Sequence, residues 1–309
     1  MAAGVTTLSE RSRIRTRELA YLGLLVATLG WGGAFIAGKM ALRDFSALST
    51  SAWRFAAAAA IVAPFAAPHF RAASLAPVAG SLALMVVCGG VLYPWLFMAS
   101  LERTSATNTS LIISVMPVLT YALCPFVGES ISRRRWVAMF LAMVGAVVVI
   151  TRGDPARVLA LGSLNLGDLL ALGAAAVWSV FNLASRRTVA GLPPPIINTF
   201  IYGIGGAVLF AMALPDEPVG QLTSASPAGL AGLLFLAIGP SVLCGHVYLH
   251  AMRVLGVSRT VPFVYCVPFV TATMAALLLG EELNYYQAAG GAFIFSGLLL
   301  ALDRRGAAG

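Results

Sequence analysis

Long apolar stretches, separated by short polar segments, run along nearly the whole chain. A helix needs about 20 mostly apolar residues to cross the hydrocarbon core of a bilayer. Stretches such as Val144–Ile150 and Leu230–Ile238 are continuously apolar, whereas the strands of a membrane barrel alternate apolar and polar residues. The pattern predicts an all-α integral membrane protein with ten transmembrane helices. The predicted spans are Leu19–Ala41, Ala47–Ala67, Ala76–Ser100, Ala106–Val127, Trp136–Ile150, Leu166–Ala184, Ile196–Leu214, Ala228–Ala251, Thr260–Leu279 and Gln287–Leu302.

The composition excludes a water-soluble globule. Of the 309 residues, 59% are hydrophobic and only 10% are charged, compared with roughly 25% charged residues in soluble domains. Too little polar surface is left to cover these apolar stretches, so the lipid bilayer must contact most of the outside of the protein.

The distribution of cations predicts the orientation. Most Lys and Arg residues, including the run Arg133–Arg135, fall at the ends of the spans that lie on the side of the N-terminus. Positive residues favour the cytoplasmic side, so we expect both termini in the cytoplasm and the protein in the plasma (bacterial inner) membrane. The net charge of +8 is then a topology signal and predicts no nucleic-acid partner. The opposite ends carry Lys39, Arg43, Arg103, Arg152 and Arg157.

The chain contains an internal repeat. Pro117 matches Pro268 at an offset of 151 residues, and Trp31 matches Trp178 at an offset of 147. The predicted organisation is a basic cytoplasmic tail (1–18), a first five-helix repeat (19–152), an inter-repeat loop (153–165), a second five-helix repeat (166–303) and a cytoplasmic C-terminal tail (304–309).

Each repeat has five spans, which is an odd number, so the second repeat enters the membrane with the opposite orientation. Inverted repeats are common in secondary transporters, because two similar halves can open a central site alternately to either side. The repeat therefore predicts a central cavity between two inverted halves.

Short motifs in each half resemble the drug/metabolite transporter superfamily, specifically its EamA-type exporters. They are Trp31 to Phe35 (WGGAF) followed by Lys39, the pair Arg54-Phe55, and the Gly-Glu pairs at Gly128-Glu129 and Gly280-Glu281. The resemblance covers essentially the whole chain. It implies a ten-helix basket with a central cavity, export of small metabolites such as amino acids, and no nucleotide hydrolysis.

The chain departs from the family pattern at one position. Trp136 stands where members often have Gln at the start of the fifth helix, whereas Gln287 keeps that residue in the tenth.

Ionisable residues inside spans are candidate site residues, because burying a charge in a bilayer is costly. Arg54 lies about 10 Å into the second span and is a candidate partner for a substrate carboxylate. The alternative is that it extends to the headgroups. His246 is a candidate hydrogen-bonding residue of the cavity, or else a packed core histidine. It lies four residues from His250, but no third ligand is evident, so we predict no metal site.

Aromatic residues inside spans form the second set of candidates. An aromatic cavity wall would suit an apolar or aromatic substrate and would attract an ammonium group. Ordinary helix packing is the alternative for each ring. The predicted substrate-binding aromatic residues are Trp31, Tyr93, Trp95, Trp178, Tyr248 and Tyr265.

Pro117 and Pro268 are related by the repeat and lie inside spans, where proline breaks or kinks a helix. We predict that they act in gating, with a simple packing kink as the alternative.

The resulting hypothesis is a secondary transporter that exports a small-molecule metabolite, best an amino acid with an aromatic or apolar side chain, by alternating access. The alternatives are a nucleotide-sugar or cationic drug transporter of the same superfamily and, outside that class, a channel or an intramembrane enzyme. The sequence predicts no catalytic residue and no cofactor. It places no carboxylate at mid-membrane, so facilitated diffusion is at least as well supported as proton coupling.

Overall fold

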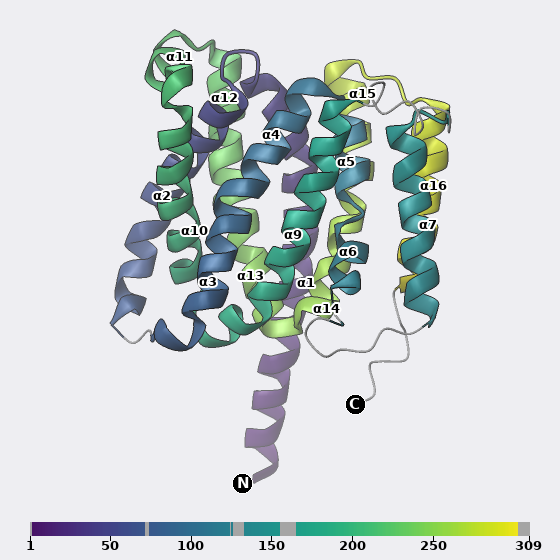
Figure 1. Ribbon diagram of the computed structural model, residues 1–309. Coiled ribbons are helices and arrows are strands. Elements are labelled where there is room, and N and C mark those ends of the chain that lie inside the picture. The colour runs from purple at the N-terminus through teal and green to yellow at the C-terminus, as the bar shows by residue number, and fades with distance from the viewer. Residues whose placement is uncertain (1, 72–73, 124, 126–132, 155–164, 302–309) are drawn as a thin grey trace.

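A computed structural model describes residues 2–71, 74–123, 125, 133–154 and 165–301 (Figure 1). Within these ranges the chain forms helices and short connections and contains no strand. The motif residues Gly128 and Glu129 lie outside the described residues, as do the predicted C-terminal tail and most of the inter-repeat loop.

The helices follow the predicted order of spans. The first half contains α1 (Ala2–Ala41), α2 (Ala47–Phe70), η1 (Ala76–Val78), α3 (Ala79–Met85), η2 (Val86–Leu92), α4 (Tyr93–Arg103), α5 (Ala106–Ile113), α6 (Met116–Ala122) and α7 (Arg133–Ile150). The second half contains α9 (Leu166–Gly191), α10 (Pro194–Ala213), η5 (Leu214–Asp216), α11 (Pro218–Ser224), α12 (Pro227–Leu236), η6 (Ala237–Cys244), α13 (Gly245–Leu255), α14 (Val257–Thr260), η7 (Val261–Cys266), α15 (Val267–Leu279) and α16 (Tyr285–Ala301).

Within the described part of the chain, six continuous helical segments are long and apolar enough to cross a membrane. They are Thr16–Ala41, Ala47–Phe70, Ala76–Arg103, Leu166–Gly191, Pro194–Asp216 and Pro227–Leu255. The segments Ala106–Ala122, Trp136–Ile150 and Val267–Leu279 are apolar but shorter. The basic segment assigned to a tail is helical from Ala2 and continues α1, whose first turns project beyond the bundle (Figure 1).

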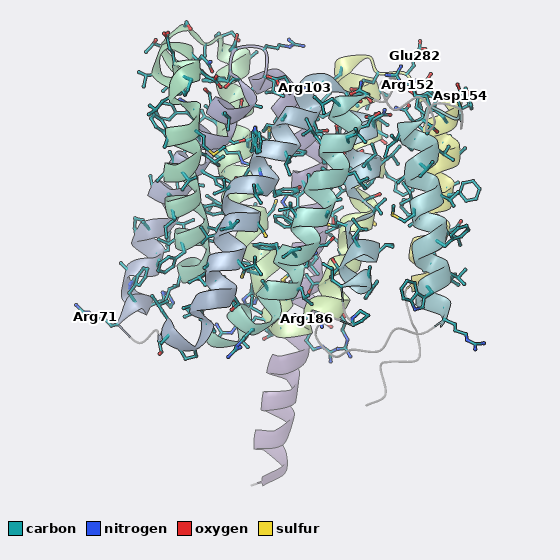
Figure 2. All side chains as sticks on the ribbon, viewed as in Figure 1. Arg71, Arg103, Arg152, Asp154, Arg186 and Glu282 are labelled. Carbon is teal, nitrogen blue, oxygen red and sulfur yellow. The ribbon has the colours of Figure 1, made fainter. Side chains whose placement is uncertain are left out.

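The outside of the bundle is apolar along its length and charged at its two ends. Phe65, Phe140 and Leu277 are 68%, 69% and 78% exposed, which suits lipid and not water. Figure 2 labels Arg103, Arg152, Asp154 and Glu282 at one end, called here the Arg103 end. Arg71 and Arg186 lie at the opposite end, called here the Arg186 end. The N-terminus lies beyond the Arg186 end (Figure 1).

Several helices begin at the Arg103 end, and polar side chains cap them there. Ser46, Ser105, Asn165 and Ser226 accept hydrogen bonds from backbone N–H groups in the first turns of α2, α5, α9 and α12. The first N–H groups of a helix have no partner within it and carry partial positive charge. Acidic residues gather at the same end for this reason, and Glu281 is one of them. Its carboxylate accepts from the backbone N–H groups of Ala106 (2.8 Å) and Thr107 (3.1 Å) at the start of α5.

Four of the predicted spans are interrupted, and in the ninth span the 3-10 segment η7 precedes α15. The fourth span breaks between α5 and α6, because Pro117 has no N–H to donate and its ring clashes with the preceding turn. The third and eighth spans each contain a π-helical segment, η2 and η6. These two segments begin at Val86 and Ala237, which are related by the repeat offset of 151 residues.

The two halves pack closely through helices that correspond in the repeat. α2 lies beside α10, and α7 lies beside α16 at the edge of the bundle (Figure 1). Glycines permit the second contact, since a Cβ on Gly145 would lie 2.5 Å from the carbonyl oxygen of Gly290. A Cβ on Gly297 would lie 2.5 Å from the carbonyl oxygen of Ala138.

Candidate functional site

A cavity lies at the centre of the bundle, between the two halves. It holds about 860 Å³ of empty space, counting the part that opens outward. Its walls come from both halves and include residues of α1, α2, α9, α10 and α13 and of both π-helical segments. The lining residues are Trp31, Ala34, Phe35, Arg54, Phe55, Gly89, Tyr93, Phe97, Ile113, Met116, Trp178, Phe181, Asn198, Ile201, Tyr202, Pro240, Ser241, Gly245, Tyr248, Leu249, Val264 and Val267.

Aromatic rings in mutual contact form much of this wall. The ring centroids of Trp31 and Tyr248 are 4.9 Å apart in an edge-to-face arrangement. The centroid of Trp178 lies 4.4 Å from those of both Tyr93 and Phe181. Such distances fall at the favourable end of the range for aromatic pairs, so the rings hold one another in place.

Backbone carbonyls of the π-helical segment η6 orient two of the lining rings. The indole Nε1 of Trp31 donates to the carbonyl oxygen of Pro240 (3.3 Å), and the hydroxyl of Tyr202 donates to that of Ser241 (2.5 Å). Because Pro240 has no N–H, it leaves a carbonyl of the preceding turn without its backbone donor, and the hydroxyl of Ser241 donates to the carbonyl oxygen of Leu236 (2.9 Å). Side chains thus supply hydrogen bonds to three carbonyl oxygens in and beside this segment.

Arg54 is the most buried charge of the cavity. Its side chain is 7% exposed, its Nε has no hydrogen-bond partner, and its Cζ lies 4.9 Å from the ring centroid of Phe55. Among the residues described, no carboxylate lies within ion-pair distance of it. Asn198, which also lines the cavity, is 1% exposed and has an unpartnered Nδ2. The cavity thus contains two buried donors that still have hydrogen bonds to give.

The lining residues are related to one another by the internal repeat. At the offset of 147 residues, Trp31 corresponds to Trp178 and Phe55 to Tyr202, and all four line the cavity. At the offset of 151, further lining residues correspond in the same way. These pairs are Gly89 with Pro240, Phe97 with Tyr248, Ile113 with Val264, and Met116 with Val267. The cavity therefore lies where equivalent parts of the two halves face each other.

The structure brings together five of the residues singled out from the sequence: Trp31, Arg54, Tyr93, Trp178 and Tyr248 all line the cavity. Their substrate-binding role stays a prediction.

Trp95 and His246 do not line the cavity. They correspond to each other in the repeat and lie two residues before the lining residues Phe97 and Tyr248. Two residues turn a helix by about 200°, which places them on the opposite face. The side chain of Tyr265 is outside the described residues.

Phe55, Phe97, Asn198 and Tyr202 also line the cavity, although they are not among the substrate-binding residues predicted from the sequence. Hydropathy gives no reason to prefer one Phe over another within an apolar helix. The repeat offsets carry the missing signal, because Tyr202 and Phe97 are the counterparts of Phe55 and of the predicted Tyr248.

Both predicted gating prolines are buried in the first turn of a helix that follows an interruption. Pro117 lies at the start of α6 and Pro268 at the start of α15. Directly beside them in the chain, Met116 and Val267 line the cavity. The interruptions are thus next to the cavity wall in both halves, and a gating role stays a prediction.

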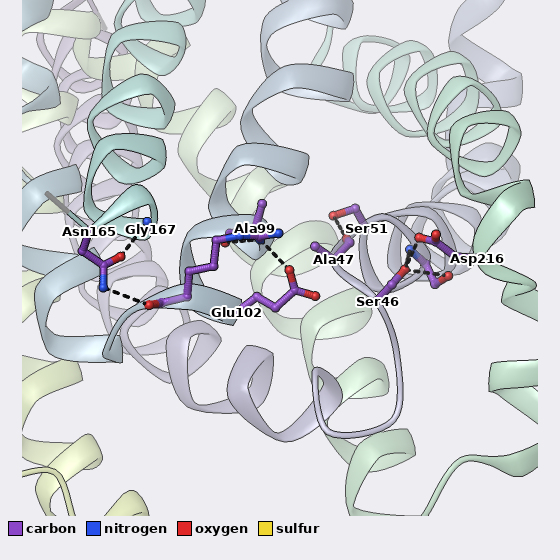
Figure 3. A network of polar contacts seen from close by, with 10 residues as sticks. Ser46, Ala47, Ser51, Ala99, Glu102, Asn165, Gly167 and Asp216 are labelled. Carbon is purple, nitrogen blue, oxygen red and sulfur yellow. Dashed lines mark hydrogen bonds and ion pairs between the residues drawn. The ribbon is translucent and has the colours of Figure 1, made fainter. Parts of the chain in front are cut away.

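Polar contacts between the two halves gather at the Arg103 end (Figure 3). A second hollow beside them is lined in part by Trp95. The hydroxyl of Ser46 donates to Asp216 (2.6 Å), and the hydroxyl of Ser226 donates to Asp44 (2.5 Å). Among the described residues, most hydrogen bonds that join the halves lie at this end. The two halves are therefore joined mainly at the Arg103 end.

Asp168 is the centre of one of these connections. It is fully buried, and its Oδ1 accepts from the hydroxyl of Thr104 (2.6 Å) and from Nδ2 of Asn108 (3.3 Å). Asn108 in turn accepts from Nε2 of Gln287 (2.7 Å). Side chains of α9, α5 and α16 are joined in this way.

The fold resembles that of solved proteins. One crystal structure superposes with a TM-score of 0.63 at 19% sequence identity and covers 92% of this chain and 97% of that chain. This likeness concerns the fold alone.

Curated relatives match along most of their length. The uncharacterized transporter YyaM of Bacillus subtilis is 28% identical over 91% of this chain and 92% of that protein. A probable amino-acid metabolite efflux pump of Salmonella typhimurium is 25% identical, covering 92% and 95%. A probable terminal-alkyne amino-acid exporter of Streptantibioticus cattleyicolor is 25% identical, covering 93% and 94%.

The model of the EamA-like transporter family matches the chain twice, at residues 18–151 and 165–302. The two matches correspond to the two halves whose equivalent residues line the cavity. The family resemblance seen in the motifs is confirmed, and this multi-pass membrane protein belongs to the EamA-like transporter family.

Proposed function

We propose that the protein is a secondary transporter that exports small metabolites, best amino acids, across the bacterial inner membrane by alternating access. It has ten transmembrane helices in two inverted repeats, with both termini in the cytoplasm, and it acts as a carrier and not as an enzyme. Six described helical segments are long and apolar enough to cross a membrane, and the shorter apolar helices Ala106–Ala122, Trp136–Ile150 and Val267–Leu279 support three further spans.

One observation carries this proposal: equivalent residues of the two halves line one central cavity. Two halves of similar structure can exchange conformations, and the exchange opens a site on their shared axis to the other side. The conformation in which hydrogen bonds join the two halves at the Arg103 end represents one of the two states. The other state requires these contacts to open and equivalent contacts to form at the Arg186 end.

Two further observations support an amino-acid substrate. Relatives from two bacteria bear the names of an amino-acid efflux pump and an amino-acid exporter. Arg54 also offers a buried guanidinium, which binds carboxylates in bidentate fashion.

Solute counterflow in proteoliposomes tests the proposal, because exchange requires no knowledge of the driving force. Vesicles are loaded with one unlabelled amino acid and diluted into a trace of its labelled form. We expect transient accumulation of label with phenylalanine or another apolar amino acid, and none in protein-free vesicles. Correctly inserted protein that accumulates no amino acid would refute this substrate assignment.

A further inference from the structure

The described lining of the cavity carries a positive charge but no negative charge. Arg54 is the one charged residue among the described residues that line it, and the lining contains no Asp or Glu. The two unpartnered buried atoms in the lining, Nε of Arg54 and Nδ2 of Asn198, are both hydrogen-bond donors. The cavity is therefore suited to a ligand with acceptor atoms that carry negative charge.

Unpartnered buried donors destabilise a protein until a partner arrives. A buried polar group without a hydrogen bond costs about 1–3 kcal/mol, and more when it is charged. A carboxylate supplies two acceptor oxygens and matches the planar guanidinium fork. Binding such a group would satisfy Arg54 and neutralise its charge at the same time.

Two backbone acceptors of the cavity wall are already in use. The carbonyl oxygen of Pro240 accepts from Trp31, and that of Ser241 accepts from Tyr202. The hydroxyl of Tyr248 donates to Oδ1 of Asn182. A substrate ammonium would find ring faces there, but it would find no carboxylate among the lining residues and would share a buried space with the positive charge of Arg54.

We propose that the cavity recognises its substrate through the carboxylate and the apolar body, and that an α-amino group is dispensable. The substrate class is then aromatic and bulky apolar monocarboxylates, of which amino acids are only one part. Arg54 and Asn198 bind the carboxylate, and the rings around Trp31, Trp178 and Tyr248 hold the body. This inference rests on the proposed function, since it takes the central cavity as the transport site.

Three ligands that differ by one group each test the proposal: L-phenylalanine, 3-phenylpropionate, which lacks the amino group, and phenethylamine, which lacks the carboxylate. Ligands that bind the folded state raise the apparent melting temperature of the detergent-purified protein. We expect 3-phenylpropionate to raise it at least as much as phenylalanine at equal concentration. Phenethylamine should bind at least about tenfold more weakly than either acid.

Two variants test whether the carboxylates raise the melting temperature by binding at Arg54. Arg54→Met keeps a long side chain without the guanidinium and should abolish the shifts caused by both carboxylates. The matched control is Arg103→Met, because Arg103 is 43% exposed, pairs with Glu102 and does not line the cavity. It should keep the shifts of the unmodified protein. If Arg54→Met does not fold, the comparison of the three ligands on the unmodified protein decides.

The proposal would be overturned if phenethylamine stabilised the protein as much as the acids do. It would also be overturned if phenylalanine stabilised the protein but 3-phenylpropionate did not, or if none of the three ligands did. Equal shifts in the Arg54→Met variant would overturn it as well. The counterflow assay separates this failure from that of the proposed function. Amino-acid counterflow without binding of 3-phenylpropionate would leave a carrier that needs the amino group, whereas loss of both would also refute amino-acid export through this cavity.

Discussion

Arg54 and Asp168 show two different uses of a buried charge. Asp168 is fully buried, and its Oδ1 accepts two hydrogen bonds from neighbouring helices. Arg54 is almost as buried, but it faces a cavity and its Nε has no partner. Oδ2 of Asp168 also has no hydrogen-bond partner in the described part of the chain, so the two charges differ in position: Asp168 joins helices of the fold, whereas Arg54 faces the cavity in which a ligand would bind.

Replacing Asp168 by Ala should therefore lower stability. The change leaves the hydroxyl of Thr104 and the amide of Asn108 without their acceptor, at about 1–3 kcal/mol for each buried donor. The apparent melting temperature of the purified protein measures the loss. Glu18→Ala serves as control, because Glu18 is exposed on α1. Equal melting temperatures for the two variants would show that the connection contributes nothing.

The sequence located most of the polar and aromatic candidates because their chemistry is unusual in a membrane span. Arg54, Trp31 and Trp178 differ from their apolar neighbours, and each lines the cavity. The face of each helix that lines the cavity was harder to predict from the sequence. Trp95 has the same chemistry as Trp31, but it lies on the far side of its helix from Phe97.

At the scale of elements, hydropathy predicted where the helices occur but not where they are interrupted. The apolar content of a segment shows that it lies in the membrane, but it contains little information on which backbone hydrogen bonds the segment forms. Pro117 gave a visible sign of the break between α5 and α6. The π-helical segment η2 contains no proline, and its pair Gly89-Gly90 weakens a helix without specifying a π-helical turn.

The contact between α7 and α16 depends on the absence of side chains at its glycines. A Cβ at Gly145 would lie 2.5 Å from the carbonyl oxygen of Gly290, which is backbone and has no rotamer with which to move aside. Gly145→Ala should therefore separate the two helices and cost about 1–3 kcal/mol. Thermal unfolding of the purified variant tests this expectation.

Gly203→Ala is the matched control for this substitution. Gly203 lies inside α10, and a Cβ there would meet nothing within 4 Å. Since Ala favours the helix over Gly, this variant should be as stable as the unmodified protein or slightly more stable. An equally stable Gly145→Ala variant would mean that α7 and α16 do not need this close approach.

At the scale of the whole molecule, alternating access requires the Arg103 end to open and close. Ser46 and Asp216 connect the halves at this end through a hydrogen bond of 2.6 Å (Figure 3). A protein with Ser46→Cys and Asp216→Cys, joined by a short bifunctional thiosulfonate that forms a reducible disulfide with each cysteine and releases a sulfinate, should lose at least about nine-tenths of its counterflow. Cleavage of the bridge should restore transport.

The bridged protein is compared with the Ser46→Cys variant treated with the same reagent, in a background without the four native cysteines. Full transport by the bridged protein would show that the Arg103 end does not move during the cycle.

Topology is a second property of the whole molecule. Reporter fusions at either terminus should behave as cytoplasmic, fluorescing as green fluorescent protein and lacking alkaline phosphatase activity. An alkaline phosphatase inserted into the loop at 153–165 should be active, since that loop is expected on the periplasmic side. Phosphatase activity at one terminus alone would contradict the proposed even number of spans, and activity at both would contradict the proposed orientation.

The π-helical segments set the direction in which two cavity rings point. A π-helix has i→i+5 hydrogen bonds where an α-helix has i→i+4 bonds, and one residue more or less in a helix corresponds to a rotation of about 100°. Phe97 follows η2 and Tyr248 follows η6, so deleting one residue from either segment should rotate that ring away from the cavity. Both segments begin at equivalent positions, so the same deletion in either half should remove an equivalent ring from the cavity wall.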